Sequence, residues 1–315
     1  MVGFDYLAKG IYGLSRAHLV SPMAGHLGAA VLAGYFIAEQ HPDLDPIVYQ
    51  GIEGELDRIL GGESVFGPKK GSHPTVEELF APVAAEKADP ALMDPLALAL
   101  SRNIDQTRES GHNVIFTALA IRALHDHPDF STPSITNGLA KLIAGFDQAK
   151  PGSGYYGKER GRIDGRKVVL PEEFPVPPYP DLTAMAVAVV DALIRHAPER
   201  RDGFGGLWHL INHGAALAEL SRYGYQKLAL QGLPAHYQHL RLWSTVPDVT
   251  AEMGAETPTT SDPHSAEFWE QKTLRRDRAR LDHRIKTLYG FDALLELVES
   301  LETRRLAEAK LRYLM

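Results

Sequence analysis

The sequence contains no cysteine among its 315 residues. Without thiols the chain can form no disulfide and can offer no thiolate as a nucleophile or a metal ligand. Secreted proteins of this size often carry disulfides, so the lack of cysteine favours a reducing compartment. The first residues, MVGFDYLAKG, show no basic segment followed by an apolar one of the kind that directs secretion. We therefore expect a cytoplasmic protein.

Long apolar runs and basic clusters are also scarce. The longest apolar run covers residues 26–38, which is too short for the roughly 20 residues of a membrane-spanning helix. The net charge is −7, and no run of lysine and arginine alternates with aromatic residues, so neither a membrane nor nucleic acid is an expected partner. The sequence lacks a P-loop, a G-x-S-x-G motif and a dinucleotide-binding fingerprint, which argues against ATP or NAD as a cofactor.

Helix-forming residues dominate what is present. Apolar residues make up 44% of the chain and charged residues 23%, the usual balance of a globular protein with a buried core. Strand-like alternation is rare, whereas stretches rich in alanine and leucine recur, so the sequence predicts an all-α fold. Segments that are apolar on nearly every face should be buried helices, and these are 23–40, 111–125, 183–197 and 206–223. Amphipathic segments should cover the core, and these are 47–60, 135–146 and 228–243.

An apolar helix, a short turn and an amphipathic helix follow one another three times. The turns His41-Pro42-Asp43 and His127-Pro128-Asp129 are nearly identical, and proline stops a helix because it lacks a backbone N–H and clashes with the preceding turn. Repeated helical hairpins stack so that their inner helices share one core. The pattern therefore predicts an α/α barrel or a toroid-like helical bundle, with a less regular bundle as the alternative.

Three segments interrupt the helical pattern, namely 61–75, 150–180 and 247–263. The longest of them, 150–180, is rich in glycine and proline, and a connection of that length in a compact fold is usually a functional loop, here a lid. We expect residues 1–260 to form a helical-repeat catalytic domain. Residues 261–315 are strongly charged and should form a helical segment that packs on the body or on a second subunit, which makes a homodimer possible.

The histidines are the most informative residues of this sequence, which contains 14 of them. His26, His112 and His213 occupy the same place in the three copies, at or near the first turn of an apolar helix. Neutral imidazoles that converge in a cavity are the commonest metal ligands in proteins. His209 lies four residues before His213 and so projects from the same helix face. The predicted ligands of a divalent metal are therefore His26, His112, His209 and His213, unless these histidines merely cap helices.

Other histidines are weaker candidates. His18 and His283 are possible additional ligands, whereas His236 and His239, three residues apart on an amphipathic segment, are expected at the surface. Asp105 and Glu109 precede His112 and could orient it as hydrogen-bond partners, although such acidic residues more often cap helices or face water.

Aromatic residues next to these histidines could line a pocket for a flat or apolar substrate. Tyr155 and Tyr156 lie in the long loop, and Phe204 and Trp208 precede His209. Such aromatic residues are as often ordinary packing residues, so the pocket is a suggestion.

Two segments resemble the questin oxidase-like family. GHNVIFTALAIRAL, which contains His112, is similar to the family stretch HG-x-I-R-T-A-H-A-x-R-A-L, with Leu119 in place of its second histidine. FGGLWHLINHGAALAELSRYG, which contains His213, is similar to the stretch NHG-x-x-A-x-x-A-L-x-x-L-G. Members of this family are helical, and characterised ones are oxygenases that act on anthraquinone-type polyketides. The resemblance implies non-haem iron held by His112 and His213.

The leading hypothesis is a metal-dependent oxidoreductase, a non-haem iron oxygenase that acts on an aromatic or apolar small molecule. A second hypothesis is a metal-free α/α-barrel lyase or hydrolase for a sugar or terpenoid, in which a histidine is the general base and Tyr155 or Tyr156 the acid. A third is a binding protein whose helical repeats present a concave surface to a partner.

Overall fold

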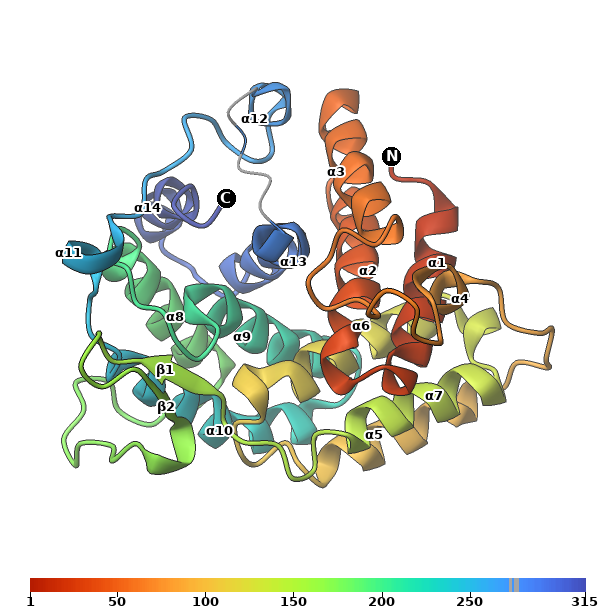
Figure 1. Cartoon of the computed structure of the whole chain (residues 1–315), viewed down its shortest axis with the longest axis horizontal. Coiled ribbons are helices and arrows are strands. Elements are labelled where there is room, and N and C mark those ends of the chain that lie inside the picture. The colour runs from red at the N-terminus through yellow and green to blue at the C-terminus, as the bar shows by residue number, and fades with distance from the viewer. Residues whose placement is uncertain (272–273, 275–277) are drawn as a thin grey trace. The chain divides into compact units, whose positions relative to one another are not determined.

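A computed structural model of the chain describes residues 1–271, 274 and 278–315 (Figure 1). Helices account for 62% of it, which confirms the all-α prediction. The described strands are β1 (Ser153–Tyr155) and β2 (Arg162–Asp164), which pair antiparallel. This hairpin lies in the segment 150–180, for which no regular structure was expected, because three-residue strands are too short to show an alternating pattern.

The described chain divides into two compact units. The first unit consists of residues 1–102, 116–147 and 261–289, and the second of residues 103–115, 148–260 and 290–315. Of the segment 261–315, residues 261–289 belong to the first unit and residues 290–315 to the second. The division into a catalytic domain and a C-terminal segment stays a prediction. The helices α6 (His112–Asp126) and α13 (Arg278–Leu295) each contribute residues to both units.

The first unit is built around α2 (Gly25–Gln40), whose residues are buried from Gly25 to Ala38. Alanine and glycine line much of α2, so neighbouring helices approach its backbone closely. Figure 1 shows α1 (Phe4–Arg16) beside it, and α1 also packs on α7 (Pro133–Ala144). The remaining helices that lie wholly in this unit are α3 (Pro46–Leu60), α4 (Val76–Phe80), α5 (Asp94–Ser101) and α12 (Ala266–Glu270).

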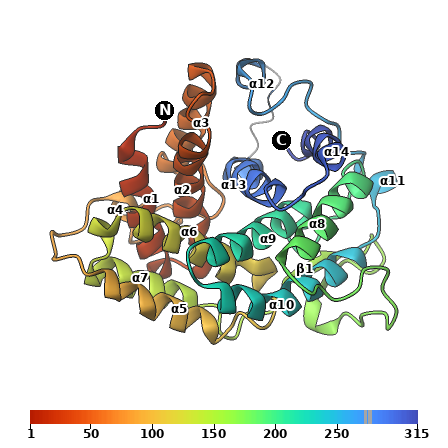
Figure 2. The same ribbon diagram turned by 180° about the vertical axis from the view of Figure 1, so that it is seen from behind.

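The second unit is built around α9 (Gly206–Arg222). Its neighbours are α8 (Leu182–His196) and α10 (Gln226–Ser244), as Figure 2 shows, and α14 (Leu301–Leu311) packs on α8. The short helix α11 (Thr250–Met253) lies in the segment 247–263, which was expected to be a connection only. Part of the charged C-terminal segment, α14, thus packs on α8 of the same chain. The homodimer stays a prediction.

The predicted helices are all present, and their ends differ from the predicted ends by at most two residues. Each of the three predicted pairs, α2 with α3, α6 with α7 and α9 with α10, occurs as consecutive helices. Their arrangement as a barrel or toroid stays a prediction. Among the described residues, no helix combines the length and the apolar character that crossing a membrane requires.

Gly28 tests how tightly α1 and α2 pack in the first unit. A Cβ atom at this position would lie 2.3 Å from the backbone nitrogen of Leu14 and 2.7 Å from the carbonyl oxygen of Gly10. We expect Gly28→Ala to lower the free energy of unfolding in urea by about 1–3 kcal/mol, because the two helix backbones must move apart.

Gly54 is the matched control, since it is an exposed helical glycine of α3 with no atom of the surrounding structure within 4 Å of the position that a Cβ would occupy. Gly54→Ala should raise the free energy of unfolding by about 0.5–1 kcal/mol through the lower backbone entropy of alanine in the unfolded chain. Equal effects of the two substitutions would contradict the close approach of α1 and α2.

Candidate functional site

The second unit contains a cluster of five buried histidines. His112 is the first residue of α6, His209 and His213 lie in α9, and His236 and His239 lie in α10. Their exposed fractions range from 0% to 4%. The sequence pointed to the three histidines of α6 and α9, but the expectation that His236 and His239 lie at the surface is wrong.

The position of His236 was readable from the spacing of its neighbours. Ala229, Leu233, Leu240 and Trp243 form a buried stripe along α10, and His236 falls on it at helical spacing. A histidine on the apolar stripe of an amphipathic helix faces the core, here towards α9, on which α10 packs. The surface expectation arose because His236 and His239 were considered only as a pair three residues apart, and not together with the apolar residues around them.

His112 and His209 form the first part of the cluster. Their rings meet edge to face, with centroids 4.5 Å apart. The Nδ1 of His112 is hydrogen-bonded to the carbonyl oxygen of Glu109, and the Nδ1 of His209 to that of Ser110 at 3.3 Å. A carbonyl oxygen can only accept, so both rings carry their proton on Nδ1 and, when neutral, a lone pair on Nε2.

His213, His236 and His239 form the second part. The Nε2 of His239 donates to the carbonyl oxygen of Phe204 at 2.7 Å, and the Nε2 of His236 to that of Leu210 at 3.0 Å. His239 therefore has its lone pair on Nδ1, which lies 3.3 Å from the Nδ1 of His213. His213 must donate in that contact, which leaves its own lone pair on Nε2.

This Nε2 of His213 is buried and has no hydrogen-bond partner among the described residues. The same is true of the Nδ1 of His236. Most buried polar atoms in proteins are hydrogen-bonded, and one that is not signals strain, an ion, a water molecule or a functional role.

Two left-handed turns hold the cluster in place. Residues 109–111 precede α6 with φ values of 39°, 60° and 87°, and residues 204–206 precede α9 with φ values of 49°, 71° and 64°. Glu109, Ser110 and Phe204 are the non-glycine residues among them, and positive φ is a strained conformation for such residues that persists only where the surroundings enforce it. The carbonyl groups of these same three residues accept the histidine protons.

Glycine is required next to the rings in both turns. A Cβ atom on Gly111 would lie 2.5 Å from the Cγ of His213, and one on Gly205 would lie 2.2 Å from the Cγ of His209. The bare backbone of each turn therefore packs directly against an imidazole ring. Any side chain at either position would displace the histidine.

The segment 150–155, which contains β1, ties the two turns together. The backbone N–H groups of Glu109 and Ser110 donate to the carbonyl oxygens of Lys150 and Pro151 at 2.7 and 3.0 Å. The N–H of Phe204 donates to the carbonyl of Ser153 at 2.9 Å. The beginning of the loop that the sequence predicted to be a lid thus braces the histidine-bearing helices.

Burial keeps the imidazoles of His213, His236 and His239 neutral. It lowers the pKa of His236 to about 3 and that of His239 to about 4. Burial also lowers the pKa of His213 well below its usual value, and the neighbouring His236, His239 and His112 add to the effect. Near neutral pH these rings retain the lone pair that a metal ion requires.

The residues expected to assist the histidines lie elsewhere. The hydroxyl of Tyr155 is bonded to the carboxylate of Glu252, and that of Tyr156 lies 2.5 Å from the hydroxyl of Thr245. Asp105 is exposed, and none of the described contacts of these three residues joins them to a histidine of the cluster. Glu109 orients His112 as expected of a partner, but through its backbone carbonyl and not through its carboxylate.

His213 lies further into its helix than the other two histidines of the repeat do. The helix α9 begins at Gly206, so His209 lies in its first turn and His213 in the second. His26 and His112, by contrast, are the second and first residues of α2 and α6. The left-handed Gly205 sets this start, and nothing in the apolar pattern of the repeat marks it.

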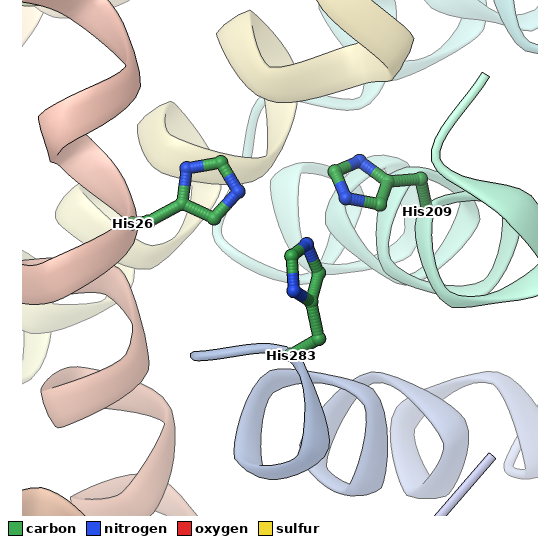
Figure 3. Close-up of side chains that lie close together, drawn as sticks. All are labelled: His26, His209 and His283. Carbon is green, nitrogen blue, oxygen red and sulfur yellow. The ribbon is translucent and has the colours of Figure 1, made fainter. Parts of the chain in front are cut away.

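His26 belongs to the first unit. Its Nδ1 is hydrogen-bonded to the carbonyl oxygen of Met23 at 2.9 Å, and its ring stacks on Phe66 with centroids 3.7 Å apart. Figure 3 shows His26 from α2 beside His283 from α13, with ring centroids 5.1 Å apart and a nitrogen of each ring within 4.8 Å of the other. His209, also drawn there, is described above with the second unit.

Some histidines of this chain could hold a metal ion, but the set of His112, His209 and His213 is not among the groups of described residues whose ligand atoms all lie within 4.8 Å of one another. Comparison of the chain with protein-family models, with curated proteins and with solved structures gives no match. The contacts of the histidines are accordingly the basis for the functional assignment.

The low pKa values predict how stability depends on pH in the metal-free protein. His236 and His239 bind protons less readily in the folded state than in the unfolded one, whose histidines titrate near pH 6.5. The contribution of the two neutral rings to the free energy of unfolding is complete above pH 6.5. It is lost as the pH falls towards about 4 for His239 and about 3 for His236. We expect the free energy of unfolding to fall by about 1.4 kcal/mol per pH unit for each of the two.

Urea unfolding at pH values from 8 to 4 measures this slope. His239→Gln should reduce the slope by the contribution of one histidine, about 1.4 kcal/mol per pH unit. His125→Ala is the control, because the side chain of His125 is 56% exposed, and it should leave the slope unchanged. A stability that stays constant between pH 7 and 5 would contradict the neutral, buried state of these rings.

Proposed function

We propose that the chain is a metal-dependent enzyme in which His112, His209 and His213 bind a divalent transition metal ion. The observation that carries this proposal is the Nε2 of His213, a lone pair that is buried without a hydrogen-bond partner among the described residues. Leaving such an atom unsatisfied costs about 1–3 kcal/mol. A metal ion at this nitrogen would remove that cost.

The hydrogen bonds of these three rings are of the kind that metal-binding histidines make. In metal sites the second ring nitrogen of a ligating histidine is usually hydrogen-bonded to a carbonyl, a carboxylate or another partner, which fixes the ring and its tautomer. Here backbone carbonyls hold the Nδ1 of His112 and His209, and His239 holds the Nδ1 of His213. Imidazole nitrogen suits zinc, copper, iron and nickel, and three protein ligands leave positions open, as catalytic sites require.

Iron and oxygen chemistry are the finer part of the proposal. They rest on the resemblance of the segments around His112 and His213 to the questin oxidase-like family, which stays a prediction. When bound, iron would supply the redox chemistry for oxidising an organic substrate. The chain itself supplies neutral nitrogen ligands and excludes water from them, since all three side chains are buried.

A cavity of the second unit supports an apolar or aromatic substrate. It has a volume of about 600 Å³ and is lined by Phe174, Tyr179, Trp243 and a face of α8 that carries both apolar residues such as Ala188 and the charged Asp191 and Arg195. Pockets for small molecules typically measure about 300–1,000 Å³. The ring of Tyr179 also lies 5.7 Å from that of His236, so one wall of the cavity contacts the histidine cluster.

The metal-free alternative has less support. A general base works best when its pKa lies near the working pH, whereas burial lowers the pKa of His236 to about 3 and of His239 to about 4. Tyr155 and Tyr156, its proposed acids, are hydrogen-bonded to Glu252 and Thr245. The histidine cluster could instead have a purely structural role, and measurement of the metal content distinguishes that role from a metal site.

Elemental analysis of protein purified without a histidine tag tests metal binding. The wild type, loaded anaerobically with Fe(II) and desalted, should retain one equivalent of metal, and His213→Ala should retain little. His239→Gln should weaken binding by about 10- to 100-fold, because it removes the hydrogen bond that orients His213.

His73→Ala is the control, since the side chain of His73 is 81% exposed, and it should bind metal like the wild type. Far-UV circular dichroism checks that each variant is folded. A wild-type protein that retains no iron, zinc or manganese after reconstitution would refute the proposal.

Nitric oxide tests whether the bound metal has an open position, without knowledge of the substrate. Anaerobic Fe(II)-loaded protein treated with nitric oxide should give the electron paramagnetic resonance signal of an iron–nitrosyl, and His112→Ala should lose it. Iron that is bound stoichiometrically but gives no such signal would indicate a closed, structural site and would contradict a catalytic role.

A further inference from the structure

Lys286 of α13 is a buried amine in the first unit. Its exposed fraction is 3%, although a lysine is almost never fully buried without a partner. Its Nζ forms no hydrogen bond or ion pair with any described residue, and the Phe116 ring centroid lies 5.9 Å away. A buried cation without a partner is costly, so such a lysine tends to be neutral.

Asp282 lies one helical turn before Lys286 and is fully buried. Its Oδ2 accepts a hydrogen bond of 2.7 Å from the hydroxyl of Ser64, and that hydroxyl accepts one of 3.1 Å from the backbone N–H of Phe66. These bonds fix the carboxyl group. The other oxygen, Oδ1, is buried and has no hydrogen-bond partner among the described residues.

The other charged groups around this pair are already matched. Glu55, whose charge acts on Asp282, pairs with Arg284 at 2.9 Å and with Arg58 at 2.9 Å. His26 and His283 contact each other and the aromatic ring of Phe66. An amine and a carboxyl oxygen thus remain on one face of α13, both buried and both without a direct partner.

Burial also lowers the pKa of Lys286, against the attraction of Asp282. A lysine with a lowered pKa in the folded state binds its proton less readily there than in the unfolded chain, so Lys286 destabilises the fold near neutral pH. Groups kept at the expense of stability are candidates for function.

We propose that Lys286 is a nucleophilic amine that forms an imine with the carbonyl group of a small aldehyde or ketone. The neutral Nζ attacks the carbonyl carbon, and the carbonyl oxygen takes up a proton to give a carbinolamine. Loss of water and of a proton from nitrogen then gives the C=N bond, so that amine and carbonyl yield imine and water. Asp282, through Oδ1, passes the proton that departs with the hydroxyl group.

The aromatic surroundings of the amine favour an apolar carbonyl compound. The ring centroid of Phe116 lies 5.9 Å from Nζ, and the His26 ring packs against Phe116 with centroids 5.5 Å apart. Desolvation by such surroundings is one of the ways in which enzymes activate an amine nucleophile. This site is formed by residues of the first unit and does not depend on metal binding by His112, His209 and His213.

Reductive trapping of the full chain tests the proposal. Propanal and cyanoborohydride at pH 7, followed by peptide mass spectrometry, would record the rate of propylation at each lysine. Because burial lowers its pKa, Lys286 holds more neutral amine at pH 7 than an ordinary exposed lysine does. We expect Lys286 to react at least tenfold faster than Lys141 and Lys227, which are exposed, and to react equally fast with a chelator present.

Variants separate reactivity from structure. Asp282→Asn should slow trapping at Lys286 at least tenfold, because the proton donor is lost while the amine remains. Lys286→Met should abolish trapping at that position and raise the midpoint of thermal unfolding at pH 7, since a buried amine is replaced by an apolar side chain of similar shape. Trapping at Lys286 no faster than at Lys141, or faster trapping that Asp282→Asn leaves unchanged, would overturn the proposal.

Discussion

Hydrogen bonds from buried imidazoles to backbone carbonyls are the constraint on which the histidine cluster depends. The acceptor carbonyls of Glu109, Ser110 and Phe204 lie in left-handed turns. Helices normally begin with unpaired N–H groups and a capping side chain. Here the carbonyl groups of the turns before α6 and α9 accept ring protons, and the segment 150–155 is hydrogen-bonded to both turns.

The direction of these bonds decides the chemistry that the cluster can perform. Each carbonyl binds one ring proton and thereby selects the nitrogen that keeps the lone pair. The tautomer of His213 is set indirectly. His239 donates its Nε2 proton to the carbonyl of Phe204, so its Nδ1 is free to accept the Nδ1 proton of His213. Backbone carbonyl groups thus set the tautomers of His112, His209, His236 and His239. Burial keeps the rings of His213, His236 and His239 neutral.

In the first unit, charged side chains of α13 are buried. The helix α13 carries many charged residues, yet Arg284 and Asp282 are buried. Arg284 is matched by an ion pair with Glu55, which satisfies both charges within the fold. Asp282 and Lys286 are not matched in this way, and the protein tolerates them at a cost in stability. One helix thus carries a buried ion pair whose charges are matched, at Arg284, and an unmatched pair, Asp282 and Lys286, that lowers stability and is proposed to react.

Much of the helical structure could be predicted from the sequence, because it depends on local properties. The apolar character of 23–40 predicted a buried helix, and α2 is buried along most of its length. The prolines that follow α2 and α6 marked the ends of both helices. Of the cluster, His112 and the pair His209 and His213 were readable as candidates because spacing alone places them on helices.

Tertiary structure decided the remainder. The apolar stripe of α10 indicates that His236 faces the core, but His236 and His239 join the cluster only because α10 packs its histidine-bearing face on α9. The left-handed turns and the bracing by 150–155 arise from backbone hydrogen bonds between distant segments. The sequence by itself determined where helices form and which histidines they carry. Only packing decided which ring nitrogens of His209, His213, His236 and His239 keep a lone pair, because the hydrogen bonds that select them join residues far apart in the chain.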